Sequence, residues 1–205
     1  MELKILETEQ AQKPARRMVH ELITPTNLTK YKEDELQRRK LRNLFTTAGL
    51  TAPEVHDLWI GSFDRSQLVG AIHATSFLHH WNPHVVFQLD TQGQAETLES
   101  IRYCCENTAF IEELAVTPDL RGQGIGKQLL QACYSYFQEH QITKFSLSAR
   151  KAESRAFFTH AGFQSFRHTL PAEYFNGVRP LEMLPEYRLS NIYMGINLEP
   201  QPLKQ

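Results

Sequence analysis

Three glycines at alternate positions are the feature of this sequence with the clearest chemical potential. Gly122, Gly124 and Gly126 lie between Arg121 and Lys127 and run directly into Leu-rich sequence. A glycine-rich turn that enters a helix exposes backbone N–H groups, and the helix dipole favours an anion there. With two cations beside it, such a turn would hold a phosphate or a pyrophosphate group. The alternative is a tight strand-to-helix turn in which the glycines meet only a steric need.

The spacing of these glycines does not fit two common nucleotide-binding loops. The dinucleotide fingerprint is G-x-G-x-x-G with an acidic residue about 20 positions further on, whereas this loop reads G-x-G-x-G and the next strand ends in SARK. The Walker loop needs a glycine five positions before its Gly-Lys pair and a Ser or Thr after it. Here Arg121 and Gln128 occupy those positions. Both mismatches count against a nucleotide-binding protein of another fold.

The residues around the glycines resemble a known family. Arg121-Gly122-Gln123-Gly124-Ile125-Gly126 is similar to the R/Q-x-x-G-x-G/A signature of the GNAT superfamily of acetyl-CoA-dependent N-acetyltransferases. AFIEELAVTPDLRGQGIGKQLLQAC resembles the fourth strand, pyrophosphate loop and third helix of that family, and FSLSARKAESRAFFTHAGF resembles its fifth strand and fourth helix. The match is strongest over 109–163. Upstream, the resemblance is only architectural: a strand, two helices and a hairpin.

This resemblance implies an α/β (α+β) fold, a mixed and mainly antiparallel sheet flanked by helices, whose fourth and fifth strands splay apart. Acetyl-CoA would be the cosubstrate and would lie between those strands. The main chain of 114–116 would pair with the pantetheine arm and the acetyl carbonyl, and the N–H groups of 123–127 would hold the pyrophosphate. The implied cofactor-binding residues are Leu114, Ala115, Val116, Arg121, Gly122, Gln123, Gly124, Ile125, Gly126, Lys127, Ser154 and Phe158.

Glu112 and Glu113 are the candidate catalytic bases, because family members often place a base on this strand. The resemblance implies direct attack by a primary amine without an acyl-enzyme, so that catalysis depends on orientation and on a base near the amine. Adjacent strand residues point to opposite faces, so at most one glutamate should reach the site. Regular alternation would place Glu112 on the same face of the strand as Leu114 and Val116, although a bulge would place Glu113 there instead. The alternative is one solvated and one structural glutamate.

Phe158 departs from the family pattern. Relatives often carry there a tyrosine that protonates the departing thiolate, and phenylalanine has no proton to donate, although it can pack against the cofactor. Lys151 and Ser154 also stand where Asn and Ala are common. Water, Tyr174 or Tyr193 could supply the proton, or the reaction could proceed without an acid. The alternative function is a GNAT-fold module that binds an acyl-CoA, or regulates through it, with little turnover.

The histidine-rich stretch HHWNPH is not interpreted as a metal site. Adjacent histidines such as His79 and His80 rarely converge on one ion, even with His84 nearby, and no Cys or carboxylate lies at ligand spacing. We therefore expect no metal. A structural role, or a role in shaping the acceptor pocket, is favoured for this stretch.

Composition limits the classes of partner. The 205 residues are 41% hydrophobic and 22% charged, with a net charge of -1, which is ordinary for a globular protein and is not the basic balance of a nucleic-acid binder. Residues 51–110 carry two Lys/Arg against seven Asp/Glu; this favours cationic ligands, or forms a solvated acidic face. The start MELKILETEQ lacks the pattern of a signal peptide, and no apolar run is long enough to span a membrane.

The three cysteines form neither a disulfide framework nor a C-x-x-C pair. Together with the lack of a signal-peptide pattern and of a membrane-spanning run, this favours a cytoplasmic protein with reduced thiols. Cys133 lies on an apolar stripe and should be in the core. We expect no nucleic-acid or membrane partner. The acceptor would be a small-molecule or peptide amine, and a homodimer is possible because family members are often dimers.

One domain over 1–205 should position these residues. The pattern of apolar residues and the positions of turn-forming residues predict strands at 3–6, 57–64, 67–77, 109–116, 144–149, 163–170 and 187–198, with a hairpin turn at 65–67. Helices are predicted with Pro14 in the first turn, after the charged 30–40 segment up to Gly49, from Ile125, and over 153–163 up to Gly162. Residues 78–108 form an insertion of uncertain structure, with a possible helix through Leu98, Ile101 and Cys105.

Overall fold

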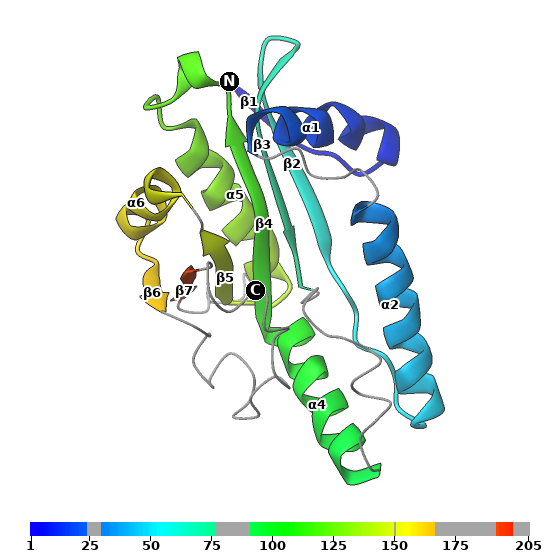
Figure 1. Ribbon diagram of the computed structural model, residues 1–205. Coiled ribbons are helices and arrows are strands. Elements are labelled where there is room, and N and C mark those ends of the chain that lie inside the picture. The colour runs from blue at the N-terminus through cyan, green and yellow to red at the C-terminus, as the bar shows by residue number, and fades with distance from the viewer. Residues whose placement is uncertain (24–29, 77–90, 150, 167–191, 199–205) are drawn as a thin grey trace, which may run out of the picture.

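A seven-stranded sheet forms the centre of the protein in a computed structural model, which describes all residues except 24–29, 77–90, 150, 167–191 and 199–205 (Figure 1). The strand order is β1-β2-β3-β4-β5-β7-β6. The strands are β1 (Glu2–Ile5), β2 (Asp57–Asp64), β3 (Gln67–Thr75), β4 (Thr108–Val116), β5 (Lys144–Ala149), β6 (Gln164–Phe166) and β7 (Ile192–Asn197). All neighbouring strands pair antiparallel except β4 and β5, which are parallel. The predicted mixed, mainly antiparallel sheet is therefore confirmed.

Helices cover both faces of this sheet. The described helices are α1 (Glu9–Leu22), α2 (Lys30–Thr47), α4 (Thr91–Asn107), α5 (Ile125–Glu139) and α6 (Ala152–His160), with a short 3-10 helix, η1 (Pro118–Leu120). Figure 1 shows α1 and α2 on one side of the sheet and α5 on the other. Side chains alternate accordingly: Leu58 and Ile60 are buried on the α5 side, whereas Trp59 between them is buried against α1.

Three apolar clusters make up the core. The α5 cluster comprises Leu58, Ile60, Val69, Ile72, Ala74, Ala109, Ile111, Ile125, Leu129, Leu130, Cys133, Tyr134, Phe137, Ile142, Phe145, Leu147, Ala149, Phe158, Phe163 and Met194. On the other face, the α1 cluster comprises Leu6, Ala15, Val19, Trp59, Ala71 and Ala115. The α2/α4 cluster comprises Leu41, Leu44, Phe45, Leu98, Ile101, Cys104, Cys105, Phe110 and Tyr193. The predicted place of Cys133 in the core is confirmed.

Two predicted helix starts are wrong. The first helix begins at Glu9, because Thr8 caps it by accepting a hydrogen bond from the N–H of Ala11 at 3.2 Å. Pro14 therefore lies inside the helix instead of in its first turn. The second helix begins at Lys30 and includes the charged 30–40 segment instead of following it.

The remaining predicted elements are found where the structure describes them. The second helix ends before Gly49, whose φ of +70° lies in the left-handed region that favours glycine. The hairpin β2–β3 turns at Arg65, and α4 contains the helix foreseen within the insertion. The predicted strands 163–170 and 187–198 are seen as β6 and β7; their other residues, 167–170 and 187–191, lie outside the described residues.

The strands β4 and β5 splay apart, as the resemblance implied. They pair only from Thr108 with Lys144 to Ile111 with Leu147. Beyond this point β4 stays paired with β3 as far as Val116, and β5 stays paired with β7 as far as Ala149. Among the described strands, none pairs with the edge of β4 that faces β5 after Ile111. A ligand with amide groups could complete that edge.

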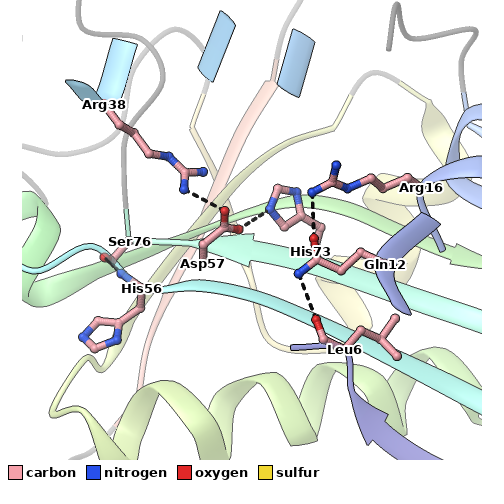
Figure 2. Close-up of polar contacts among 8 residues, drawn as sticks. All are labelled: Leu6, Gln12, Arg16, Arg38, His56, Asp57, His73 and Ser76. Atoms are coloured by element: carbon pink, nitrogen blue, oxygen red, sulfur yellow. Dashed lines mark hydrogen bonds and ion pairs between the residues drawn. The ribbon is translucent and has the colours of Figure 1, made fainter. Parts of the chain in front are cut away.

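His56, just before β2, contacts the C-terminal end of α5. The centroid of its ring lies 4.0 Å from that of His140 and 6.3 Å from that of Tyr136. Its backbone N–H donates to the hydroxyl of Ser76 at 2.9 Å (Figure 2). Burial and then the charge of His140 lower the pKa of His56, and the carboxylate of Glu54 only partly opposes them.

We expect the free energy of unfolding to fall as the pH drops below about 6.5, the ordinary histidine pKa. Because the pKa of His56 is lower in the folded state, the unfolded chain binds more protons in this window and acid favours unfolding. Urea unfolding at about pH 8 and about pH 5.5 would measure the effect. His56→Gln should weaken this pH dependence, whereas His160→Gln, at an exposed position of α6, should not. Equal pH dependence in wild type and His56→Gln would contradict the assignment.

Candidate active site

A groove of about 730 Å³ lies beside the edge of β4 where β5 diverges. It is lined by the C-terminal half of β4, the loop from β4 into α5, the N-terminal end of α6 and the C-terminal end of α1. The structure brings all of the implied cofactor-binding residues except Gln123 together around it. They are Leu114, Ala115, Val116, Arg121, Gly122, Gly124, Ile125, Gly126, Lys127, Ser154 and Phe158.

Other residues of the groove were missed from the sequence. Leu22 and Ile23, at the end of α1, line it from the side opposite α6. The Nζ atom of Lys151 donates to the carbonyl of Ile23 at 3.3 Å and so connects these two sides. The apolar spacing of α1 predicted only a buried helix face, and no sequence signal connected it with a loop so far along the chain. Leu120, Glu153 and Phe157 complete the additional lining.

The three glycines serve two different purposes. Gly122 and Gly124 have φ angles of +80° and +82°, and Gly124 is the N-cap of α5. A Cβ atom at either position would meet nothing within 4 Å, so the backbone conformation is what requires glycine there. At Gly126 a Cβ atom would lie 3.3 Å from the ring of Phe157, so this glycine allows α5 and α6 to pack closely.

The beginning of α5 has the electrostatics of an anion site. The first helical hydrogen bond runs from the N–H of Gln128 to the carbonyl of Gly124 at 3.0 Å, so the N–H groups of 125–127 have no acceptor within the helix. The first turn has no acidic residue, and Arg121 and Lys127 both line the groove. The helix dipole and these cations together favour a phosphate group at this end of the groove.

The strand β4 contains a bulge at the candidate bases. His73 of β3 pairs with Glu113, and Ala74 pairs with Ile111, so that Glu112 is the extra residue. Ile111 and Leu114 both pack against the α5 cluster, although simple alternation would place them on opposite faces. The regular alternation that would place Glu112 and Leu114 on the same face is therefore interrupted at Glu112. The structure has the bulge that the sequence analysis left open as an alternative.

The two glutamates differ in burial. Glu113 is only 6% exposed, whereas Glu112 is half-buried. Glu113 shares a face with His73 because residues directly opposite in an antiparallel pair project to the same side. Among the residues that the structure describes, neither glutamate lines the groove itself. The structure places both beside its β4 wall.

A partly exposed ion pair, connected to a buried histidine, lies next to Glu113 on the α1/α2 face of the sheet. Arg38 of α2 donates through Nη1 to Oδ2 of Asp57 at 2.7 Å, and Oδ1 of Asp57 lies 2.7 Å from Nε2 of His73 (Figure 2). Burial alone would raise the pKa of the Asp57 carboxyl, but the hydrogen bond and charge of His73, together with Arg38, hold it well below its usual range. None of these three residues is predicted as functional from the sequence, whose only signal is a histidine between apolar residues of β3.

The ring of His73 is fixed on its other side by Trp59. The two rings are stacked, with centroids 4.3 Å apart and an interplanar angle of 7°. The guanidinium of Arg16 lies over the ring of Trp59, 5.9 Å from its centroid, and donates to Gln12 Oε1 at 2.7 Å. Figure 2 shows Arg38, Asp57, His73 and Arg16 following one another from α2 to α1.

The described side chains considered as proton donors and nucleophiles lie away from the groove, and Phe158, which lines it, has no proton to donate. Phe158 is 7% exposed and packs edge-to-face against Phe157 and Phe163. Tyr193 is buried in the α2/α4 cluster, and Tyr174 lies outside the described residues. The three cysteines are buried, and burial raises the pKa of the Cys105 thiol to about 12. None of these candidates, where the structure describes them, is placed to protonate a leaving thiolate.

The described residues show neither a metal-ion site nor a membrane-spanning helix. Within the described part of the chain, no group of three or more His, Cys, Asp or Glu side chains is placed to hold a metal ion. The stretch 79–84 lies outside the described residues. None of the described helices is long and apolar enough to cross a membrane.

Comparison with known proteins bears on this geometry. The sequence model described as the Acetyltransferase (GNAT) family matches residues 16–163. A GNAT family acetyltransferase from Staphylococcus aureus is similar in structure, with a TM-score of 0.54 and 13% identity over 97% of this chain and 100% of that chain. Gcn5 from Tetrahymena is also similar in structure, with a TM-score of 0.52 and 14% identity over 98% of this chain and 99% of that chain.

A third similar structure is the PaiA N-acetyltransferase from Thermoplasma acidophilum in complex with coenzyme A, with a TM-score of 0.50 and 15% identity over 96% of this chain and 99% of that chain. At these identities the likeness shows a shared fold. No curated protein matches the sequence significantly.

The ion pair of Asp57 with Arg38 gives a stability prediction. Asp57→Asn should lower the free energy of unfolding by about 1–2 kcal/mol at neutral pH, because it removes two charge-assisted hydrogen bonds at a partly exposed carboxylate. Since the folded-state pKa is depressed, this stabilisation is present above the unfolded pKa of about 3.9 and is lost as the pH falls through the folded value.

Urea unfolding of wild type and Asp57→Asn at about pH 7 and about pH 3.5 would therefore show a difference that narrows in acid. Asp64→Asn, at the exposed far end of β2, is the control and should resemble wild type. A difference that is as large in acid as at neutrality would refute this account of the pair.

Proposed function

The chain belongs to the GNAT family of acetyltransferases, and from this we propose that it transfers the acetyl group of acetyl-CoA to a primary amine by direct attack of the amine. The observation that carries the proposal is the groove between β4 and β5, where an open strand edge meets the N-terminal end of α5. The acceptor would be a small molecule or a peptide that presents such an amine.

The residues of the groove fit coenzyme A. The left-handed glycines bring the loop into α5 with its N–H groups directed out of the helix end, as a diphosphate requires. The edge of β4 that no described strand pairs offers main-chain groups of 114–116 to the amides of the pantetheine arm, although the carbonyl of Val116 already accepts from Nε of Arg121 at 3.2 Å. When bound, acetyl-CoA would supply the acetyl group as an activated thioester.

Glu113 is the better placed of the two candidate bases. It is buried, in register with His73, and immediately precedes the stretch of β4 that lines the groove. A protonated amine cannot attack, so its proton must leave before or during the attack. We propose that this proton goes to the carboxylate of Glu113, and that Glu112, the extra residue of the bulge, is not the base.

The absence of a tyrosine at Phe158 does not argue against turnover. A free thiol has a pKa of about 8.5, so near neutral pH the thiolate of coenzyme A leaves readily and takes its proton from water. The buried cysteines, which do not line the groove among the described residues, also favour direct attack over an acyl-enzyme.

The experiment that tests this function has two stages. Isothermal titration with acetyl-CoA and with CoA should show saturable binding to one site per chain. A panel of primary amines should then be screened for release of the CoA thiol, with Glu113→Gln and Glu112→Gln beside wild type. We expect Glu113→Gln to lower kcat by about 10²–10⁴-fold and Glu112→Gln to have little effect.

Each other outcome of this experiment has a distinct meaning. Protein that is folded but does not bind acetyl-CoA would overturn the proposal. Binding without turnover of any amine would favour the alternative function, a module that binds an acyl-CoA. Turnover that depends on Glu112 and not on Glu113 would leave the function standing and reverse the assignment of the base.

The glycine loop gives a second prediction with a matched control. Gly124→Val should reduce the affinity for CoA by at least about tenfold, a loss of roughly 1.4 kcal/mol, because a β-branched residue at positive φ distorts the loop that holds the diphosphate. Gly49→Val imposes similar backbone strain at the end of α2, also with no atom within 4 Å of the added Cβ. Both variants should lose thermal stability, but only Gly124→Val should lose affinity in the titration; unchanged affinity would make the loop purely structural.

A further inference from the structure

Resting on the proposed function, we propose that His73, held by Asp57, is a positioning residue for the reaction: acting through Glu113, it takes up the proton that this carboxylate receives from the amine. The carboxylate of Glu113 would contact the amine. His73 and Asp57 would act through Glu113, from the face of the sheet covered by α1 and α2.

The register of the sheet brings these side chains together. Trp59 of β2 is directly opposite His73 of β3, and His73 is directly opposite Glu113 of β4. Residues opposite one another in antiparallel strands share a face, with Cβ atoms about 4.5–5.5 Å apart. The imidazole of His73 therefore lies between the carboxylate of Asp57 and the side chain of Glu113.

These polar residues separate two apolar clusters. Along β4, Glu113 lies between Phe110, which belongs to the α2/α4 cluster, and Ala115, which belongs to the α1 cluster. His73 is 2% exposed and Glu113 is 6% exposed. Burying polar groups in the middle of a sheet costs stability that apolar side chains would not cost. A role in the reaction gives a reason for placing them there.

The hydrogen bond to Asp57 defines what His73 can do. A carboxylate only accepts hydrogen bonds, so Nε2, 2.7 Å from Asp57 Oδ1, carries the hydrogen. In neutral His73 the remaining ring nitrogen, Nδ1, is then the acceptor atom, and it is buried. Trp59 and Asp57 fix the plane of the ring, and Arg38 fixes Asp57. The histidine is thus prepared to accept a proton without reorienting.

The proton balance can be stated for the whole step. The ammonium gives its proton to the carboxylate of Glu113, which passes a proton to Nδ1 of His73, and the imidazolium remains beside the carboxylate of Asp57. The amine nitrogen forms the C–N bond, the C–S bond breaks, and the thiolate leaves with the bonding electron pair and is protonated by water. The nitrogen of the new amide still carries one excess proton, which goes to the carboxylate of Glu113 that was regenerated when its first proton passed to His73. After the products leave, both protons return to water, where one neutralises the hydroxide left by protonation of the thiolate.

Other charged groups pack around this unit. Arg38 comes from α2, and Arg16 with His20 one turn later comes from α1. Glu112 precedes Glu113 on β4.

A first experiment tests the arrangement without relying on activity. Long-range ¹H–¹⁵N correlation spectra of the full chain, labelled at histidine and bound to CoA, report the tautomer of each ring. His73→Gln assigns the signals. We expect His73 to be the Nε2–H tautomer, Asp57→Asn to disturb that tautomer, and Glu113→Gln to move the ring ¹⁵N signals of His73 more than Asp64→Asn does. Signals that do not respond to Glu113→Gln would overturn the inference.

A second experiment tests whether the residues act as a unit, with an amine from the panel that is turned over. His73→Gln should lower kcat by about 10–100-fold and leave KM for acetyl-CoA unchanged. In the Glu113→Gln background the same change should have no further effect, because groups that act in series lose their contribution together. Independent, additive losses would overturn the inference, as would wild-type kcat in His73→Gln.

The two experiments separate this inference from the proposed function. If wild type binds acetyl-CoA but acetylates no amine, the proposed function fails and the inference fails with it. If wild type acetylates an amine and the His73 signals ignore Glu113→Gln, the function stands and only the inference fails. Thermal melting of each variant confirms that the folded protein is being measured, and Asp64→Asn should keep wild-type kcat.

Discussion

The divergence of β4 from β5 is the constraint on which the site depends. Backbone N–H and C=O groups need partners, and β3 satisfies only one edge of β4 beyond Ile111. The glycine loop, the start of α5 and the ends of α1 and α6 all border the space that this divergence leaves. An extended chain with amide groups would complete the sheet there as an added strand does. The proposed pantetheine arm would complete the edge in this way.

β4 faces two environments, and the bulge at Glu112 adapts it to both. Upstream of the bulge its side chains alternate between the α5 cluster and the α2/α4 cluster. Downstream, Leu114 faces the α5 cluster and the groove, whereas Ala115 belongs to the α1 cluster. The shift of one residue sets Glu113 opposite His73 at the junction. A cofactor side and a polar side therefore meet on one strand.

The parts that sequence alone could predict are local. The loop, β4, α5 and α6 follow from patterns within 109–163, where each signal lies a few residues from its neighbour. The contacts of Asp57 with His73 and with Arg38 join residues 16 and 19 positions apart, and the contact of Lys151 with Ile23 joins residues 128 positions apart. Apolar periodicity does not encode such pairings. Nor does it reveal the bulge, because the two adjacent glutamates fit either phase of the alternation.

Several departures from ordinary folding rules lie on β4 or beside it. Left-handed glycines, a bulge, a one-sided strand edge and buried polar side chains each cost free energy that a regular sheet with an apolar interior would avoid. Such features also occur elsewhere: Gly49 and Arg65 are left-handed at a helix end and in the β2–β3 turn, and β2 has a second register shift at 62–63. A left-handed residue is ordinary at a helix end or in a turn, whereas a buried glutamate opposite a buried histidine in the middle of a sheet is not. Local rules are broken where a site requires it, and this pair is therefore the departure that most calls for a functional reason.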